Sequence, residues 1–186
     1  MLPDATVIRH ALAAAGLDVG EFMETALGLS YALSSADVVG ALAALKASQL
    51  GYFMLVDLLG TDTGDDVEIT YHLRSFTRDE ELYVKTRLPY GGTLASVWES
   101  YPAALLPERE TAEMFGLTLS GHPNPKRLLT TEGVPPLLKH AIPLHEVVKI
   151  DLHIPGCPPK ADAIFYVISE LLAGRKPDLM NKVKFG

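Results

Sequence analysis

The sequence predicts an α+β fold in which a mostly antiparallel sheet is flanked by helices. Two runs, residues 67–76 and 81–88, alternate apolar and polar side chains with the period of half-buried strands. Only a short polar turn, 77–80, separates them, as expected for an antiparallel hairpin. The 186 residues are 48% hydrophobic and 21% charged, which is ordinary for a globular domain with a core of its own.

Helices and further strands are predicted before this hairpin. Residues 4–15 have the apolar spacing of an amphipathic helix and open on an aspartate that can cap it. Residues 21–33 are interpreted as a single strand. Residues 36–48 are rich in alanine and predict a second helix, which Ser34 or Ser35 could cap.

The next segments are predicted to be a buried strand and a short helix. Residues 52–59 are almost all apolar, as in a strand covered on both faces. Further on, Pro107 suits the first turn of a helix, and Gly116 is a natural stop because glycine enters the left-handed conformation without strain. Arg109 and Glu113 are four residues apart and could pair along this helix.

Composition excludes several classes of function. The net charge of −7, without a basic run, argues against a nucleic-acid surface. The longest apolar stretches, such as 51–60, are too short to span a bilayer, and the first residues lack the layout of a secretory signal. A single cysteine cannot form an internal disulfide, so we expect a reducing cytoplasm.

The stretch 101–129, YPAALLPERETAEMFGLTLSGHPNPKRLL, contains ERExxxMFG between PA and GHP. It resembles the signature of the thirty-kilodalton subunit of NADH-quinone oxidoreductase (respiratory complex I), a domain that also occurs in energy-converting hydrogenases. This sequence departs from the family pattern at three positions. The family has tryptophan at the positions of Tyr101 and Leu106, and aspartate at the position of Glu113. The order of the predicted elements from residue 38 onwards is similar to that family as well.

This resemblance implies a surface that docks against a neighbouring subunit and implies no catalytic residue. The docking residues that it implies are Glu108, Arg109, Glu110, Phe115, His122 and Pro123. Two simpler interpretations stay open at this point. The acids could form a solvated helix start, near the positive end of the helix dipole. His122 could be a hydrogen-bonded turn residue beside its proline.

The tail contains a second motif, PGCPP, around Cys157. Together with its surroundings it resembles the C-terminal end of the small subunit of NAD-coupled [NiFe] hydrogenases, in which this cysteine ligates a [4Fe–4S] cluster. A cubane cluster needs about four thiolates, and Cys157 is the only cysteine here. Either a partner chain supplies the others, or the motif is retained as structure. A strand at 147–154 and a helix at 162–173 are predicted on either side of the motif.

Three parts follow from these resemblances: a domain resembling the thirty-kilodalton subunit at 1–129, a proline-containing strap at 130–143, and the tail at 144–186. The implied role is a non-catalytic scaffold subunit in the peripheral arm of a complex I-like oxidoreductase, beside a large subunit and a small subunit that bears clusters. Those neighbours would pass electrons to quinone or protons. The chain alone would bind no cofactor and would meet the inner face of the plasma membrane only through the complex.

Two rival hypotheses remain. In the first, the chain is an electron-transfer subunit that contributes Cys157 to an intersubunit [4Fe–4S] cluster. In the second, it is a free-standing soluble domain. Against the second stand the strap and the apolar face of the tail helix, which would lack a partner.

Overall fold

The computed structural model describes residues 3–17, 20–25, 28–138, 154 and 161–178. The chain divides into two compact units, Met1–Ala141 and Ile142–Gly186, and each is described by itself. The elements of the main sheet and its first helices are α1 (Ala5–Ala14), β1 (Phe22–Thr25), β2 (Gly28–Ala32), α2 (Val38–Ala47), β3 (Met54–Asp62), β4 (Val67–Ser75) and β5 (Glu80–Leu88).

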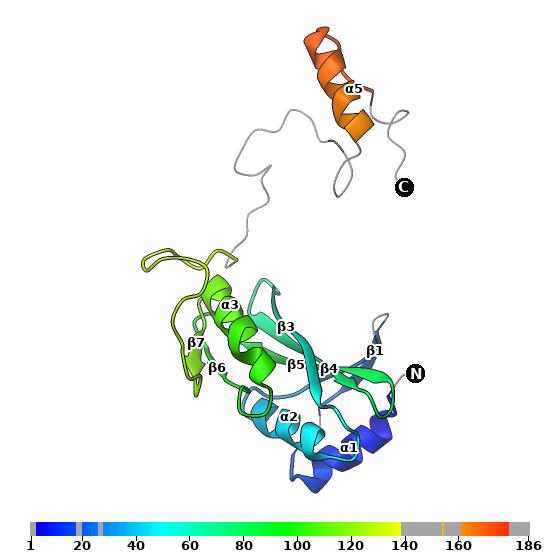
Figure 1. The fold of residues 1–186 in the computed structure, drawn as a ribbon, viewed down its shortest axis with the longest axis vertical. Coiled ribbons are helices and arrows are strands. Elements are labelled where there is room, and N and C mark those ends of the chain that lie inside the picture. The colour runs from blue at the N-terminus through cyan, green and yellow to red at the C-terminus, as the bar shows by residue number, and fades with distance from the viewer. Residues whose placement is uncertain (1–2, 18–19, 26–27, 139–153, 155–160, 179–186) are drawn as a thin grey trace. The chain divides into compact units, whose positions relative to one another are not determined.

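The first unit is built on a five-stranded sheet with the order β1-β2-β5-β4-β3 (Figure 1). Neighbouring strands are antiparallel except for β2 and β5, which are parallel. The two alternating runs form the predicted hairpin, in which Tyr71 lies opposite Val84. The α+β fold with a mostly antiparallel sheet is therefore confirmed.

One face of the sheet carries the core. The inward positions of β4 and β5, such as Ile69 and Leu82, are fully buried. Helices α1, α2 and α3 (Leu105–Phe115) add Ile8, Leu42 and Phe115 to the same apolar cluster. Gly60 on β3 is where α3 comes closest, because a Cβ there would lie 2.6 Å from the Phe115 ring. The three helices therefore cover the same face of the sheet.

The start of the chain differs from the sequence prediction in its strands. Residues 21–33 form an antiparallel pair, β1 and β2, rather than a single strand. Gly28 is the first residue of β2 and has a φ of +142°, a conformation that glycine adopts without strain. The backbone can therefore change direction at this residue. Phe22 and Tyr31 lie opposite each other, with ring centroids 5.2 Å apart.

The two N-terminal helices differ in how they are capped. Asp4 accepts a hydrogen bond from the amide of Thr6 at 2.8 Å, as predicted for the cap of α1. The predicted serine cap of α2 is wrong, because this helix begins later, after Asp37. The hydroxyl of Ser34 instead donates to the carboxylate of Asp37 at 2.6 Å and stabilises the turn that precedes the helix.

Strand β3 was predicted to be buried on both faces, and this is wrong. It lies at the edge of the sheet and its outer face is uncovered, so Met54, Val56 and Leu59 are each more than 40% exposed. The register shifts between Leu55 and Asp57, which is typical of a bulge in an edge strand. An apolar edge of this kind is left for another surface to cover.

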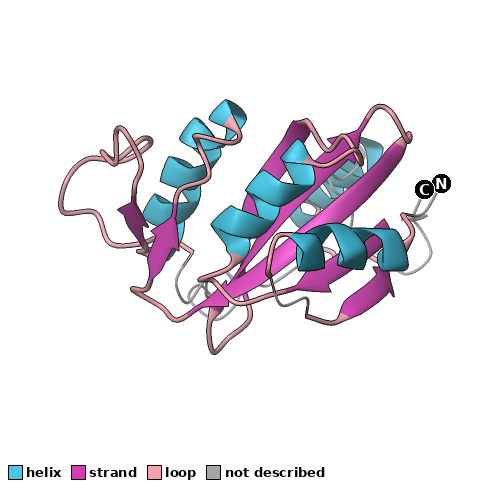
Figure 2. Cartoon of the chain, turned by 90° about the horizontal axis from the view of Figure 1, so that it is seen from below, coloured by secondary structure: helices cyan, strands magenta, loops and turns pink. Residues whose placement is uncertain are grey.

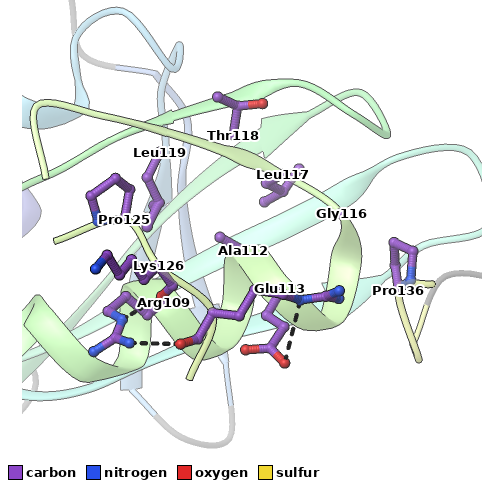
Figure 3. Close-up of a pocket in the computed structure, with 11 residues that line it drawn as sticks. Arg109, Ala112, Glu113, Gly116, Leu117, Thr118, Leu119, Pro125, Lys126 and Pro136 are labelled. Carbon is purple, nitrogen blue, oxygen red and sulfur yellow. Dashed lines mark hydrogen bonds and ion pairs between the residues drawn. The ribbon is translucent and has the colours of Figure 1, made fainter. Parts of the chain in front are cut away.

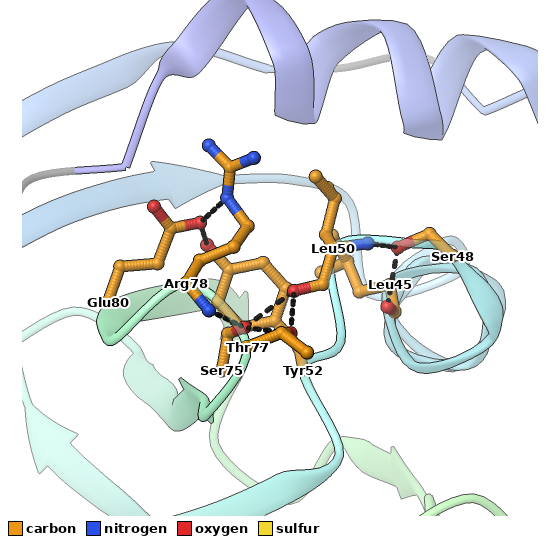
Figure 4. A network of polar contacts seen from close by, with 8 residues as sticks. All are labelled: Leu45, Ser48, Leu50, Tyr52, Ser75, Thr77, Arg78 and Glu80. Atoms are coloured by element: carbon orange, nitrogen blue, oxygen red, sulfur yellow. Dashed lines mark hydrogen bonds and ion pairs between the residues drawn. The ribbon is translucent and has the colours of Figure 1, made fainter.

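A buried polar network fixes the segment between α2 and β3 (Figure 4). The hydroxyl of Tyr52 donates to the carboxylate of Glu80 at 2.9 Å, and Arg78 donates to the same oxygen at 2.7 Å. The hydroxyl of Ser75 donates to the carbonyl of Leu50 at 2.6 Å. These bonds satisfy polar groups that would otherwise be costly to bury.

The second unit contains α5 (Ala161–Leu172), the helix predicted in the tail. It ends as predicted at Gly174, whose φ is +70°, and the amide of Arg175 bonds to the carbonyl of Glu170 at 2.9 Å. Cys157 and all but the last residue of the predicted strand 147–154 lie outside the described residues. Within the described part of the chain, no helix has the length and apolar character needed to cross a membrane.

Candidate functional site

The signature stretch folds around helix α3. A short 3₁₀ turn, η1 (Pro102–Ala104), leads into α3, and Gly116 ends the helix with a φ of +70°, as predicted. A small parallel sheet of β6 (Thr93–Ala95) and β7 (Thr118–Ser120) lies beside the helix (Figure 2). The loop after β7 then returns to α3, and the charged residues of the signature hold it there.

Glu108 points into the protein rather than into solvent. Its side chain is fully buried and accepts hydrogen bonds from the amide of Val97 at 2.7 Å and from the hydroxyl of Ser96. Burial raises the pKa of this carboxyl, although the two hydrogen bonds and nearby His122 act in the opposite direction. The interpretation of a solvated helix start is therefore wrong for this residue.

His122 is a turn residue, as the simpler interpretation proposed. The amide of Asn124 donates to its Nδ1 at 3.0 Å. Because Nδ1 accepts this bond, it is Nε2 that donates to the carbonyl of Leu105, at 2.9 Å. Its Nε2 is 3.9 Å from the carboxylate of Glu108. The histidine thus connects the loop after β7 to the first turn of α3.

Arg109 and Glu113 do not act as the pair that their spacing suggested. The guanidinium of Arg109 donates to the carbonyl oxygens of Lys126 and Arg127, at 2.7 and 2.8 Å. These bonds hold the loop against the side of α3 (Figure 3). Arginine suits this task because its planar fork presents several donors in a fixed geometry.

Glu113 holds the next part of the same loop. Its carboxylate accepts hydrogen bonds from the amides of Leu128, Leu129 and Thr130, at 2.5, 3.0 and 2.6 Å, and from the hydroxyl of Thr130. The hydroxyl bond is the main cause that lowers the pKa of Glu113 to about 2, and the amide bonds add to it. The sequence carries no local signal for this site, because the donors lie 15 to 17 residues away from the acid.

A cavity of about 440 Å³ lies between α3, β7 and the loop (Figure 3). Its lining includes three basic residues, Arg109, Lys126 and Arg127, and one acid, Glu113, whose carboxylate lies 3.8 Å from Nε of Arg127. Pro136 of the strap closes another side next to Gly116. The strap is held there by the amide of Leu138, which donates to the carbonyl of Met114 at 2.9 Å.

The residues implied for docking fall into two groups. Glu108, Phe115 and His122 are buried and contact their own chain, at Val97, at Gly60 of β3 and at Leu105. Arg109 is half-buried, and Glu110 and Pro123 are exposed. The docking role itself stays a prediction, and only the second group presents side chains that a partner could contact. Among the described residues no cluster of side chains suits a metal ion.

Several curated relatives of this chain are C subunits of NADH-quinone oxidoreductases. The matching NADH-quinone oxidoreductase subunit of Rhodobacter capsulatus is 40% identical over 82 residues, which cover 42% of this chain and 41% of that protein. Its counterpart in Methylorubrum extorquens is 32% identical over 124 residues, or 64% and 57% of the two chains. The chain thus spans about half the length of the curated relatives that it matches.

Two further comparisons concern hydrogenases and the fold. The delta subunit of the NAD-reducing hydrogenase HoxS of Cupriavidus necator is 48% identical over 50 residues, covering 27% of this chain and 24% of that one. This match agrees with the second resemblance seen in the sequence. A chain of the archaeal membrane-bound sulfane sulfur reductase has the same fold, with a TM-score of 0.58 at 18% identity, over 83% of this chain and 96% of that chain.

The sequence model of the respiratory-chain NADH dehydrogenase 30 kDa subunit matches residues 31–147, which include the sheet from the end of β2 onwards, helix α3 and the strap. Because this match covers more than half of the 186 residues, the chain belongs to the family of the 30 kDa subunit of respiratory-chain NADH dehydrogenase.

Proposed function

We propose that this chain is a non-catalytic scaffold subunit in the peripheral arm of a complex I-like oxidoreductase, of the NADH-quinone oxidoreductase type or of the energy-converting [NiFe] hydrogenase type. It would support a large subunit and a small subunit that bears clusters, and those neighbours would carry electrons to quinone or protons. Its place would be the cytoplasmic side of the membrane, which it would meet only through the complex.

The observation that supports this proposal is that three charged residues of the signature bind groups of their own chain. Glu108, Arg109 and Glu113 all bind backbone or hydroxyl groups of their own chain. Their hydrogen bonds fix the conformation of the segment that precedes α3 and of the loop that follows β7. A catalytic acid or base needs its proton or lone pair to face a reactant, whereas a rigid docking surface needs this kind of internal support.

Exposed apolar side chains support the same proposal. In the first unit one group of them lies beside β3, where Phe53 and Phe76 are more than half exposed. A cavity of about 300 Å³ lies at this edge, between Phe53 and Phe76 on one side and η1 on the other. Apolar surface of this extent is typical of a subunit whose partners cover it.

A second candidate function is an electron-transfer role through Cys157, and the similarity to the HoxS delta subunit favours it. The donor set of this chain alone does not fit a [4Fe–4S] cluster, because it offers a single thiolate and the cluster needs about four. A cluster shared with this chain would therefore need the other ligands from a partner protein.

Native purification from the source cells tests both candidates. We expect the tagged chain to co-elute with a large subunit, a cluster-bearing subunit and membrane proteins, identified by mass spectrometry, together with iron. Elution of the chain alone, as a stable monomer without iron, would refute both candidates.

A variant separates the two candidates. If Cys157→Ser leaves the set of co-eluting partners and the iron content of the assembly unchanged, the scaffold function stands alone. If iron and the electron paramagnetic resonance of one reduced cluster are lost while the partners still co-elute, the shared cluster is supported.

A further inference from the structure

We propose that the cavity between α3, β7 and the loop receives an extended acidic segment of a partner polypeptide, which adds to the free edge of β7. This inference rests on the proposed scaffold function, because it assigns that function a specific contact. It concerns the residues that line the cavity, and the apolar edge of β3 plays no part in it.

The edge of β7 offers main-chain hydrogen bonds to such a segment. The amide of Thr118 donates to the carbonyl of Gly92 at 2.9 Å, and the carbonyl of Ser120 accepts from the amide of Ser96 at 2.8 Å. In a parallel ladder, alternate residues bond to the same neighbour, so the N–H and C=O of the intervening Leu119 point away from β6. No described residue forms a backbone bond with them, and Leu119 lines the cavity.

The charge of the lining selects an acidic segment. The ammonium group of Lys126 is exposed and has no hydrogen-bond partner among the described residues, while Arg109 and Arg127 flank the same cavity. Glu113 lies 3.8 Å from Nε of Arg127 and offsets one of the three positive charges of the lining, so the lining keeps a net positive charge. The positive wall stands out in a chain whose net charge is −7.

The shape of the cavity favours an extended chain over a small ion. Its volume of about 440 Å³ is far larger than a single carboxylate or phosphate needs, and the buried Leu117 and the partly buried Leu119 give it apolar walls beside the basic ones. Strand addition uses the same combination: main-chain bonds to an edge strand provide affinity, and pockets for alternate side chains provide specificity. An alternation of acidic and apolar residues would match both walls.

Fluorescence anisotropy with a defined probe tests this site on the purified 186-residue chain. The probe is a fluorescein-labelled, end-blocked octapeptide of alternating glutamate and valine, and the control peptide has lysine in place of glutamate. We expect the acidic peptide to bind more tightly, and Lys126→Glu to weaken it about tenfold by reversing one contact charge. The control variant Arg9→Glu makes the same charge change on the exposed side of α1, where Arg9 lies beside Phe22 of β1, and should alter the affinity less than about twofold.

Hydrogen exchange distinguishes strand addition from binding by charge alone. Binding of the acidic peptide should slow the exchange of the Leu119 amide, because that N–H gains an acceptor from the added strand. Equal affinity for the two peptides, equal effects of Lys126→Glu and Arg9→Glu, or unchanged exchange at Leu119 would each overturn the proposal. Competition by inorganic phosphate at the same concentration as the peptide would overturn it in favour of a small-anion site.

Assembly in cells separates this proposal from the proposed function. When wild type and Lys126→Glu are expressed together with distinguishable tags, we expect the variant to be incorporated several-fold less into the purified complex. Equal incorporation would overturn the cavity as the contact and leave the scaffold function standing. Absence of wild type from any complex would refute the scaffold function, while the peptide assay would still decide whether the cavity binds acidic chains.

Discussion

At the scale of single residues, the charged groups of α3 act on the backbone of their own chain. Glu108 anchors the segment before the helix, and Glu113 anchors the loop that follows β7. Their environments shift the two pKa values in opposite directions. Burial raises the pKa of Glu108, whereas the hydrogen bonds that Glu113 accepts lower its pKa. Each therefore has its own pH signature and its own test.

Glu113→Gln is expected to loosen the loop at Leu128–Thr130 without unfolding the domain, because an amide oxygen accepts these donors less strongly than a carboxylate. The folded-state pKa is about 2, so the carboxylate stabilises the loop above the ordinary carboxyl range and this stabilisation is lost as the pH falls towards 2. At pH 6 we expect these amides to exchange about tenfold faster in the variant. Glu132→Gln, an exposed change nearby, is the control, and equal exchange in both variants would contradict the prediction.

Glu108→Gln is expected to change how stability depends on pH. Because the pKa is raised on folding, the folded protein keeps a proton that the unfolded chain has already lost, so this group makes stability fall as pH rises through that range. The stability of the wild type relative to the variant should therefore decrease as the pH rises above the ordinary carboxyl value of about 4, as measured by urea unfolding. Glu110→Gln, on the exposed side of α3, is the matched control. A difference that stays constant over this range would refute the assignment.

At the scale of elements, the strap is joined to the C-terminal end of α3. Gly116 makes this possible in two ways, because its φ is +70° and because a Cβ there would lie 2.6 Å from Cγ of Pro136. The carbonyl of Met114, which helix geometry leaves without an intrahelical partner, accepts the amide of Leu138 instead. The end of the helix and the start of the strap therefore form one structural unit.

Gly116→Ala is expected to destabilise the domain and to displace the strap. The left-handed conformation alone costs a non-glycine residue about 1 kcal/mol, and the contact with Pro136 adds to that cost. Gly91→Ala is a matched control, because its φ is +73° and nothing lies within 4 Å of its added Cβ. Both variants should unfold at lower urea concentration, and only Gly116→Ala should speed exchange of the Leu138 amide. Unchanged exchange there would mean that the strap does not depend on this contact.

At the scale of the whole molecule, each unit exposes apolar surface. In α5 the exposed residues recur at helical spacing, and Phe165 and Leu172 are 74% and 84% exposed. The first unit exposes its own apolar edge at β3, where Phe76 is 66% exposed. Such surfaces are costly in water, so we expect the isolated chain to associate with itself.

Phe165→Gln is expected to reduce this self-association, because it removes the most exposed ring of the α5 stripe. Sedimentation velocity over a range of concentrations measures the effect. Phe76→Gln makes the same change in the first unit and is the matched comparison. A decrease with Phe76→Gln alone would assign the associating surface to the first unit, and a wild-type chain that stays monomeric at high concentration would contradict the prediction.

Local patterns were enough to predict much of the fold. The cap of α1, the β4–β5 hairpin, the end of α3 at Gly116 and the tail helix α5 all follow from spacing and from side-chain chemistry within a few residues. The outcome was different where partners lie far apart in the chain. The parallel pairing of β2 with β5 and the exposed outer face of β3 depend on how the elements meet.

The same distinction holds for the candidate site. By itself, the sequence determined that this stretch is a capped helix with a charged face, followed by a histidine turn, and it carried the resemblance to the family. Only the tertiary structure decided that Glu108 is buried, that Arg109 and Glu113 hold a loop rather than each other, and that Lys126 borders a cavity. The reason is physical: helix caps and turns depend on neighbours in sequence, whereas burial and the hydrogen bonds of a buried charge depend on segments that come together only when the chain folds.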